Sequence, residues 1–497
     1  MTTALATQAF WKRPLSENRT VVVASLVLLT VAVASRIMAY GDPVLHVDDE
    51  FYLLGGHEII RGHLPYIDFW DRKPPGIFLL YAFFALFLDD VLAYQFGGTI
   101  FAWATSFVIF LMTRSLVHNR GAILAGMSYL VMLPLFGGMG GQTPVFYNLL
   151  IALAAYFAIR HHENPEAARQ QRYIVYSMSL CGLALTIKPT TLPEVIFIAS
   201  VIYISSKDHL DVKSSVLLLL KMGVLIVLPT ALIGLLYAAI GAWADLWFAM
   251  VVSIFRRESL GATATRAGIL YFLMFITPMA VIAARGLFTL RIISAKAAFF
   301  MTSWIGAAVV GFLLVPTFYI HYSLPLLVPL AVASGTVYNQ PRSGPLLLGA
   351  LALFSMLNSQ MMNFRQFRKD KMEYTRLRLA ATKCPLHASL FVQDGPPRLY
   401  DEVSARRLTR LSFPDHLGLN IEHNSIPVDQ AKETERIMSM RPDVVVTADP
   451  PGARATGVVA ATLSRELSLH YQATASAVLP LDLHFVSHIV WCRNSKL

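Results

Sequence analysis

The sequence predicts an α-helical protein that crosses a membrane about 11 times and ends in a small α/β domain outside it. Hydrophobic residues make up 55% of the 497 residues and charged residues only 14%, whereas a soluble protein carries roughly 25% charged residues. Apolar runs long enough to span a bilayer recur from Val21 to about Gln360, and charges become frequent only after Asn363. This composition excludes an ordinary soluble enzyme, a disordered chain and a coiled coil.

Charge and cysteine usage agree with a membrane protein. The net charge of +10 is typical of Lys and Arg in cytoplasmic loops, so we expect no nucleic-acid partner. Three cysteines are too few for a disulfide scaffold or a cysteine-based metal site. The apolar run Val21–Met38 is longer than the core of a signal peptide, and we interpret it as a first span. Lys12, Arg13 and Arg19 precede it and place the N-terminus in the cytoplasm.

The path of the chain after the first span has two interpretations. Gly76–Leu88 is apolar but short, and Asp89 and Asp90 follow it. If this segment crossed the membrane, several basic loops would face outward. If it lies along the surface, Val91–Met112 is the second span and five basic loops fall inside, namely 114–120, 160–172, 207–213, 285–296 and 340–342. The positive-inside rule favours the surface interpretation, which places everything after Asn363 outside.

One outer loop breaks the charge rule in this topology. Gly241–Arg266 contains Arg256, Arg257 and Arg266. Binding of an anionic ligand would explain why this outer loop carries three arginines.

The polar stretch after the first span contains an acidic run, Asp48-Asp49-Glu50. We expect a helix over roughly 50–61, with Glu50, Leu54, His57 and Arg61 on one face. The acids then have two compatible roles. They favour the positive N-terminus of that helix, and a carboxylate there is able to act as a general base, since a free Asp is ionised at neutral pH.

A second polar cluster, Asp68 to Pro75, precedes the surface helix. The prolines start that helix, so Arg72 and Lys73 lie at its N-terminus, a position that favours anions. One interpretation is headgroup anchoring by Trp70, Arg72 and Lys73. The other is that Lys73 contacts a lipid-linked phosphate.

Further polar residues lie at the outer ends of later spans: Lys188, and the pair His321-Tyr322. A lysine there is costly unless it pairs or reaches the interface. His46, His57, His63 and His321 could build a metal site with Asp49, but no tight ligand spacing supports one. We therefore expect no catalytic metal and no other cofactor.

The order of these motifs carries a family resemblance. Asp49-Glu50 follows the first span, and then come Gly62-His63-Leu64-Pro65-Tyr66 and Asp71-Arg72-Lys73-Pro74-Pro75-Gly76. Lys188 follows a Gly-Leu-Ala-Leu-Thr run, and His321-Tyr322-Ser323-Leu324-Pro325 comes late. Over most of residues 20–360 the sequence resembles the GT-C membrane glycosyltransferases, in the branch with protein O-mannosyltransferases and lipid A aminoarabinose or galacturonic acid transferases.

The resemblance implies a GT-C domain over residues 1–362, with a first outer loop at 41–90, and a periplasmic α/β domain over 363–497. It implies inverting transfer of one sugar from a polyprenyl-phosphate-linked donor to a hydroxyl of a glycan, lipid or protein acceptor. The reaction would take place on the outer face of the bacterial cytoplasmic membrane.

The resemblance also implies roles for individual residues. Asp49 is the expected base, and Glu50 an orienting residue. The side chains expected to bind the donor phosphate are Lys73, Lys188, Arg256, Arg257 and His321. Those expected to bind the acceptor are Asp48, His57, Asp71, Arg72 and Tyr322.

Two features depart from the family pattern or leave it open. Thr143-Pro144 stands where the family often carries a Thr-Glu pair, and the run Asp48-Asp49-Glu50 leaves the register of the base open. We interpret the C-terminal domain as a capping domain or an acceptor-binding domain. Cys384 and Cys492 would both face an oxidising compartment, so we expect a disulfide between them.

Two other function classes compete with single-sugar transfer. A flippase or transporter of lipid-linked sugars would place its ionisable residues near the bilayer midplane and often shows inverted repeats. This chain gathers its polar groups at one face and shows no repeat. A ligase that transfers a whole glycan from a polyprenyl diphosphate would share the basic outer surface, but it fits the Asp-Glu motif less well.

Overall fold

The computed structural model describes residues 18–88, 90–164, 166–207, 210–258, 261–315, 317–386, 388–481 and 484–494. The chain divides into two compact units, each made of three chain segments. Unit 1 comprises Met1–Ile37, Phe96–Leu232 and Gly261–Met362, and unit 2 comprises Met38–Gln95, Ile233–Leu260 and Asn363–Leu497. The sequence predicts a boundary at residue 363, where the chain enters unit 2 for the last time. The domain division 1–362 and 363–497 stays a prediction.

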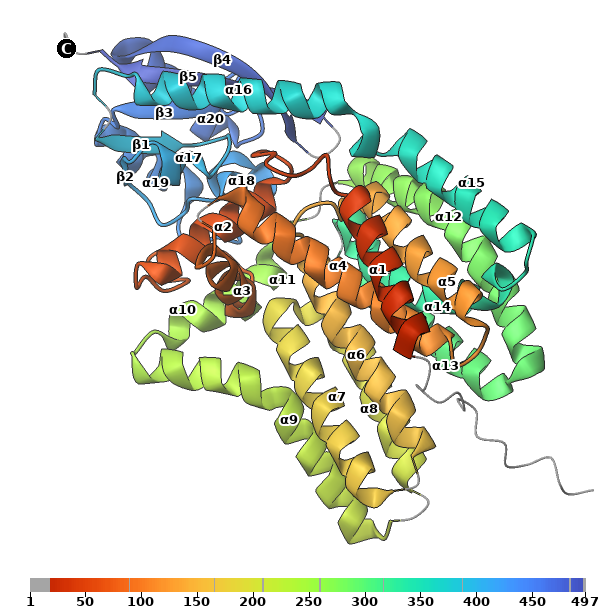
Figure 1. The fold of residues 1–497 in the computed structure, drawn as a ribbon. Helices are drawn as coiled ribbons and strands as arrows, with labels where there is room; N and C mark the ends of the chain where they lie inside the picture. The colour runs from red at the N-terminus through yellow and green to blue at the C-terminus, as the bar shows by residue number, and fades with distance from the viewer. Residues whose placement is uncertain are drawn as a thin grey trace, which may run out of the picture. The chain divides into compact units, whose positions relative to one another are not determined.

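Unit 1 is a bundle of long apolar helices (Figure 1). The helices of this bundle are α1 (Asn18–Ala34), α4 (Val91–Thr113), α5 (Asn119–Met132), α6 (Thr143–Glu163), α7 (Ala167–Ile187), α8 (Leu192–Lys207), α9 (Val212–Ala239), α12 (Ala262–Ile293), α13 (Ala295–Leu313), α14 (Leu327–Tyr338) and α15 (Ser343–Asn358). α4 begins, and α9 ends, within unit 2. Short 3₁₀ turns extend three of these helices, including Ile320–Leu326 before α14.

Eight helices in the described part of the chain are long and apolar enough to cross a membrane. α1 and α15 are apolar but shorter, and α7 is 21 residues long but begins with the polar run Ala-Ala-Arg-Gln-Gln-Arg. Counting these three would give 8 + 3 = 11 spans, so the number 11 stays a prediction. The polytopic helical class itself is confirmed.

Small residues let the helices of unit 1 approach closely. A Cβ built on Gly286 of α12 would lie 2.0 Å from the carbonyl oxygen of Ala333 in α14. One built on Gly182 of α7 would lie 2.6 Å from the carbonyl oxygen of Ile226 in α9. Apolar side chains gain little from leaving lipid for a protein contact, so close backbone packing at small residues is what holds membrane helices together.

Unit 2 combines short helices with a five-stranded sheet. Its helices are α2 (Val47–Ile60), α3 (Pro75–Ala85), α10 (Trp243–Trp247), α11 (Ser253–Arg256), α16 (Phe364–Thr382), α17 (Leu399–Glu402), α18 (Pro414–Gly418), α19 (Gln430–Ser439) and α20 (Gly457–His470). A π-helix, Phe248–Val252, joins α10 to α11. The strands are β1 (Ser389–Val392), β2 (Arg406–Arg407), β3 (Val444–Ala448), β4 (Tyr471–Leu481) and β5 (His484–Arg493).

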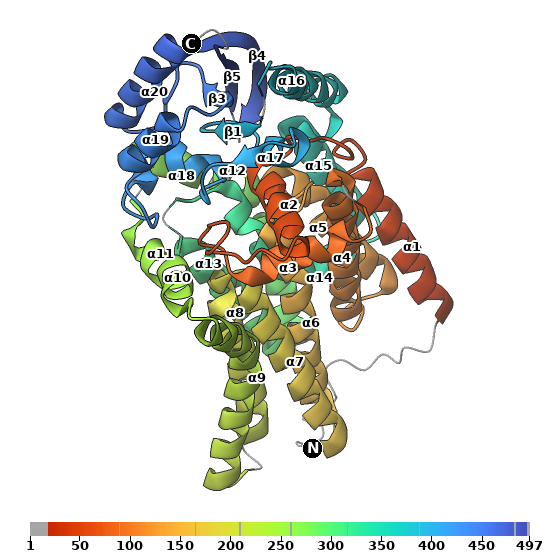
Figure 2. The ribbon, with the colours of Figure 1, turned by 90° about the vertical axis from the view of Figure 1, so that its left-hand side faces the viewer.

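The C-terminal segment forms the α/β domain that the sequence predicts. Its sheet has the order β2-β1-β3-β5-β4, with β1 parallel to β2 and β3, and β5 antiparallel to β3 and β4. Figure 2 shows α16 on one face of the sheet and α19 and α20 on the other. The disulfide between Cys384 and Cys492 is present, so that prediction is confirmed.

The expected start of the first outer helix is wrong by three residues. α2 begins at Val47, because the acidic run lies inside its first turn instead of ahead of it. Three carboxylates in that turn face the partial positive charge of the helix N-terminus. The cap residue is His46, whose side chain makes no capping hydrogen bond.

Three segments that the sequence places outside the membrane share one hydrophobic core in unit 2. Tyr66 and Trp70 come from the first segment, Leu246 and Ala249 from the second, and the C-terminal segment supplies most of the remainder, including Phe391. Residues in one core must lie on one side of a membrane. With the predicted order of spans, a spanning 76–88 segment would put residues 41–75 on the opposite side from the other two segments, so the shared core favours the surface interpretation. α3, at 11 residues, reaches only about 16 Å, half the thickness of the hydrocarbon core.

The shared core predicts the sidedness of three exposed positions. Single cysteines at Ile67, Glu258 and Glu435 should react with a membrane-impermeant maleimide from the same side, because each lies on the surface of unit 2. A cysteine at the exposed Lys213 should react only from the other side. Labelling of intact cells and of inverted vesicles makes the measurement. Labelling of Ile67→Cys and Glu435→Cys from opposite sides would refute the shared core.

The disulfide predicts a stability difference. It closes a loop of 108 residues, so the Cys384→Ser/Cys492→Ser variant should lose about 2–5 kcal/mol of unfolding free energy. Denaturant unfolding of the purified protein in detergent measures this loss. The control is Cys181→Ala, which removes a buried thiol outside the disulfide. Equal stability of the double variant and wild type would contradict the prediction.

Candidate active site

The acidic turn of α2 presents its three carboxylates in different surroundings. The Asp48 side chain is 18% exposed, whereas Asp49 is 0% and Glu50 2% exposed. Burial raises the pKa of Glu50 well above its ordinary value, and the nearby Arg398 opposes this only in part. Glu50 is therefore suited to orient neighbours as a neutral acid, while Asp48 is the carboxylate that a ligand is able to reach.

Lys73 is held against this turn. Its Nζ lies 3.1 Å from Oδ1 of Asp48 and 3.2 Å from Oδ2 of Asp71. The ammonium also lies 5.3 Å from the ring centroids of both Tyr52 and Phe413. Two carboxylates and two aromatic faces thus keep a charged lysine next to Asp48.

The backbone around Lys73 explains this placement. The Tyr66 hydroxyl donates to the Lys73 carbonyl at 2.7 Å, and Pro75 occupies the first turn of α3. Trp70 is 1% exposed and belongs to the core of unit 2. The interpretation of Trp70 as a headgroup anchor is therefore wrong, because its ring is already buried by protein.

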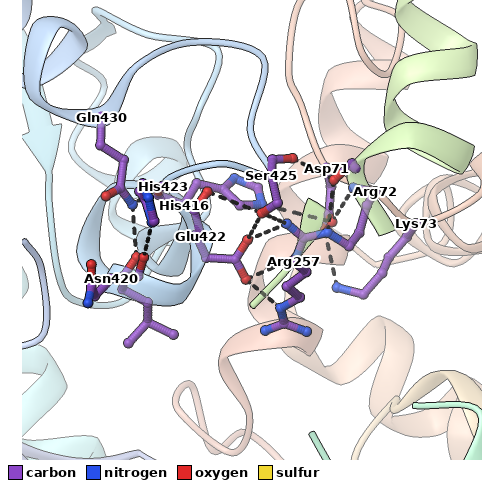
Figure 3. A network of polar contacts seen from close by, with 12 residues as sticks. Asp71, Arg72, Lys73, Arg257, His416, Asn420, Glu422, His423, Ser425 and Gln430 are labelled. Carbon is purple, nitrogen blue, oxygen red and sulfur yellow. Dashed lines mark hydrogen bonds and ion pairs between the residues drawn. The ribbon is translucent and has the colours of Figure 1, made fainter. Parts of the chain in front are cut away.

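Next to Lys73, one carboxylate joins arginines from two other segments (Figure 3). Arg72 forms a two-pronged ion pair with Glu422, through Nη1 at 3.1 Å and through Nη2. Arg257 Nε lies 2.8 Å from the same carboxylate. Burial alone would raise the pKa of Glu422, but Arg72 and Arg257 outweigh it and lower the pKa to about 2.

Two serines complete this group. Ser425 accepts from Arg72 Nη2 at 3.0 Å and donates to Glu422 Oε2 at 2.7 Å. Ser253 accepts from Arg72 Nε at 3.2 Å and donates to the Ser425 carbonyl at 2.6 Å. We call Arg72, Arg257, Glu422, Ser253 and Ser425 the Glu422 clamp.

His416 lies beside the clamp and Asp71 (Figure 3). Its ring is 0% exposed, and its Nε2 lies 4.0 Å from Oδ1 of Asp71. Trp70 packs edge-on against the ring at 4.7 Å, and Phe413 at 5.2 Å. Burial is the largest cause that lowers the pKa of His416 to about 3, so the imidazole is neutral near pH 7.

His57 lies at the other end of α2 and contacts the C-terminal segment. Its Nδ1 lies 2.9 Å from Oδ2 of Asp401, and Arg61 reaches the same carboxylate at 2.9 Å. Glu58 pairs with Arg61 at 2.7 Å and also with Arg407. These contacts fasten α2 to the C-terminal segment.

The remaining predicted residues lie elsewhere. Arg256 is exposed, and its guanidinium lies 5.8 Å from the ring centroid of Phe248. In unit 1, Lys188 is the C-cap residue that follows α7, and its Nζ lies 4.6 Å from the ring centroid of Tyr322. His321 packs against Tyr322 at 4.4 Å and is 8% exposed. Unit 1 therefore brings Lys188 and His321, predicted to bind the donor phosphate, together with Tyr322, predicted to bind the acceptor. These roles stay predictions.

Within the described ranges, no group of three or more His, Cys, Asp or Glu side chains is placed to hold a metal ion.

Comparison with known proteins identifies the fold. Residues 71–233, about a third of the chain, match the family described as dolichyl-phosphate-mannose-protein mannosyltransferase. The structure of ArnT from Cupriavidus metallidurans bound to undecaprenyl phosphate is similar with a TM-score of 0.63 and 13% identity, covering 96% of this chain and 98% of that one. A search of curated proteins found no match.

A second group of structures is similar to a lower degree. The Archaeoglobus fulgidus oligosaccharyltransferase in the apo form has a TM-score of 0.53 at 11% identity, covering 88% of this chain and 70% of that one. AglB from Archaeoglobus fulgidus, in complex with an inhibitory peptide and a dolichol-phosphate, has a TM-score of 0.51 at 10% identity, covering 97% of this chain and 75% of that one.

The chain has the GT-C fold. The resemblance drawn from the order of motifs is confirmed at the level of the fold, and the fold with its apolar helices makes this a multi-pass membrane protein.

Several residues of this GT-C protein's candidate site escaped sequence reasoning. Glu422, Ser425, His416 and Asp401 lie in the C-terminal segment, where the motif order of the membrane part gives no guidance. Ser253 had one available signal, since it lies three residues before Arg256 in the basic outer loop.

The Glu422 clamp predicts a pH-dependent stability. The pKa of Glu422 falls from an ordinary 4.5 to about 2 on folding, so its contribution is fully present above about pH 4.5 and is lost as the pH falls towards 2. Glu422→Gln should therefore cost about 3 kcal/mol at pH 7. Denaturant unfolding of wild type and variant from pH 7 to pH 3 measures the difference, which should narrow below pH 4.5.

Glu258→Gln is the control for this prediction, because Glu258 lies nearby but is 48% exposed. A wild-type stability for Glu422→Gln at pH 7 would show that the clamp does not hold unit 2 together.

Proposed function

We propose that this protein transfers a single sugar from a polyprenyl-phosphate-linked donor to a hydroxyl of a glycan, lipid or protein acceptor. The observation that carries the proposal is the partly exposed Asp48 held beside Lys73, in a chain with the GT-C fold. Such a pair offers a base for the acceptor and a cation for a phosphate in one place. Two structures of the same fold contain lipid phosphates, ArnT with undecaprenyl phosphate and AglB with a dolichol-phosphate.

The difference in exposure supports Asp48 over Asp49 as the base. A base must come within hydrogen-bond reach of the acceptor hydroxyl. The Asp48 side chain is 18% exposed, whereas Asp49 is fully buried. The sequence assigned this role to Asp49; we propose Asp48 as the base, with Asp49 and Glu50 as buried residues that orient the turn.

The reaction is a single displacement. Asp48 accepts the proton of the acceptor hydroxyl as its oxygen attacks the anomeric carbon. The bond from that carbon to the phosphate oxygen breaks, and its electron pair leaves with the polyprenyl phosphate. Attack opposite the leaving group inverts the anomeric configuration.

Cations replace a general acid for this leaving group. A phosphate monoester leaves without protonation when positive side chains stabilise its charge. We propose Lys73 and the exposed Arg256 for this role. Arg257 and Arg72 are committed to Glu422, so they position the site; the roles of Lys188, His321 and Tyr322 stay predictions.

The side of the membrane follows from the basic loops. The shared core supports one side for all three segments of unit 2, and the predicted order of spans puts the loops 114–120, 160–172 and 207–213 on the other side. The positive-inside rule makes the loop side cytoplasmic. We therefore propose that the active site faces the periplasm of a bacterial inner membrane.

Transfer of a whole glycan is the second candidate. The similarity to an oligosaccharyltransferase favours it, since the GT-C fold serves both kinds of transfer. The mass added to the acceptor distinguishes them: one sugar for our proposal and several for the second candidate.

Removing the base should separate catalysis from binding. Asp48→Asn keeps the shape of the side chain, so transfer should fall by about 10²–10⁴-fold while undecaprenyl phosphate binding stays. The measurement is the initial rate at which purified variants restore product in membranes that lack the gene, with carrier binding by native mass spectrometry. Full activity of Asp48→Asn, with loss in Asp49→Asn, would return the role to Asp49.

Removing a phosphate-binding cation should instead weaken binding of the carrier lipid. Arg256→Ala should weaken undecaprenyl phosphate binding without unfolding the protein, because its side chain is exposed. Arg465→Ala is the matched control, an exposed arginine on α20. Equal carrier binding by Arg256→Ala and wild type would remove Arg256 from the donor site.

A further inference from the structure

A cavity of about 540 Å³ lies in unit 2 outside the acidic turn. Four arginines line it: Arg406, Arg407, Arg410 and Arg436. The acidic side chains in its wall are Asp68 and Glu433. The volume falls within the roughly 300–1,000 Å³ typical of small-molecule sites.

The two acidic residues are committed to the protein. Glu433 accepts two bonds from Arg436 at 2.7 Å and one from the Thr409 hydroxyl at 2.7 Å. Hydrogen bonds to Arg436 and Thr409 outweigh burial and lower the pKa of Glu433. Asp68 accepts from the Leu64 backbone N–H at 2.8 Å. Both carboxylates thus already accept hydrogen bonds from groups of the protein.

Three of the arginines keep donors for a ligand. Arg406 is exposed, and its guanidinium makes no hydrogen bond or ion pair within the described ranges. Arg407 pairs with Glu58, yet its Nη1 is buried with no acceptor among the described residues. Arg410 reaches Asp245 only at 3.3 Å, and both side chains are partly exposed. A buried donor without an acceptor is costly, so Arg407 Nη1 favours an anion that would accept from it. Arg406 and Arg410 add positive charge beside it.

The wall of the cavity is fixed in place. The Trp70 backbone N–H donates to the Arg410 carbonyl at 2.8 Å, and Arg410 Nη1 donates to the Tyr66 carbonyl at 3.0 Å. Leu411, in the same wall, belongs to the core of unit 2 with Trp70. The cavity therefore adjoins the segment that continues into Asp71, Arg72 and Lys73.

We propose that this cavity binds an anionic sugar residue of the acceptor, one that carries a carboxylate or a phosphate. A guanidinium binds either group through two parallel N–H donors. Leu408 and Val428 add an apolar surface for the ring, and Thr409 a hydroxyl. The inference rests on the proposed transferase function for its biological role and names the acceptor class for it.

Binding of simple sugars to the full-length protein tests this inference without turnover. Glucuronate, glucose 6-phosphate and neutral glucose are titrated by calorimetry into protein in phospholipid-free detergent, so that no lipid headgroup competes. At least one of the two anionic sugars should bind, and glucose should not. Whichever anion binds identifies the carboxylate or the phosphate as the recognised group.

The variants assign that binding to the cavity. Arg406→Gln should weaken it at least about tenfold, the usual effect of losing a charge-assisted hydrogen bond. Arg465→Gln, outside the cavity, should bind like wild type. Asp48→Asn should also bind like wild type, so failure of the transferase proposal and failure of this one are distinguishable. Equal binding of glucose, binding of neither anion, or wild-type affinity in Arg406→Gln would overturn the inference.

Discussion

A single buried carboxylate joins the three chain segments of unit 2. Arg72 comes from the first segment, Arg257 from the second and Glu422 from the third. Long apolar helices separate these segments in the sequence, so each reaches unit 2 independently. A buried ion pair gains little net free energy, because desolvation offsets most of the attraction, but breaking it leaves uncompensated charge. Its main effect here is on the specificity of folding, because misplacing any one segment leaves at least one charge buried without its partner.

Pairing with carboxylates of the protein divides the cationic side chains of unit 2 into two groups. Arg72, Arg257 and Arg436 are engaged by carboxylates of the protein. Lys73 is engaged too, but by the partly exposed Asp48, so its surroundings remain accessible to a ligand. Arg256 and Arg406 are exposed. We propose that the positive charge of unit 2 serves two functions, assembly of the unit and binding of anions.

The sequence predicts what depends on local pattern. Apolar runs predicted the long helices of unit 1. The short run after Pro75 predicted a surface helix, an interpretation that the shared core of unit 2 favours. The rise in charge after Asn363 marked where the C-terminal α/β domain begins. The order of motifs around Asp49, Lys73 and His321 pointed to the correct fold.

Long-range pairing was beyond sequence reasoning. Arg257 gives no sign in its own neighbourhood that Glu422 will neutralise it, because 165 residues separate them (422 − 257). The exposure of Asp48 and the burial of Asp49 likewise depend on which face of α2 meets α3 and the C-terminal segment. Neighbouring residues in the sequence are chemically equivalent here, and only the tertiary packing distinguishes them.

The central claim is that one sugar is transferred at this site. The most direct measurement compares the membrane glycolipids and glycoproteins of intact cells by mass spectrometry in three arms: wild type, a strain lacking the gene, and that strain complemented with Asp48→Asn. The account predicts that the same single-monosaccharide mass is lost from one acceptor in the second and third arms. Loss of a multi-sugar mass, or full restoration by Asp48→Asn, would contradict it.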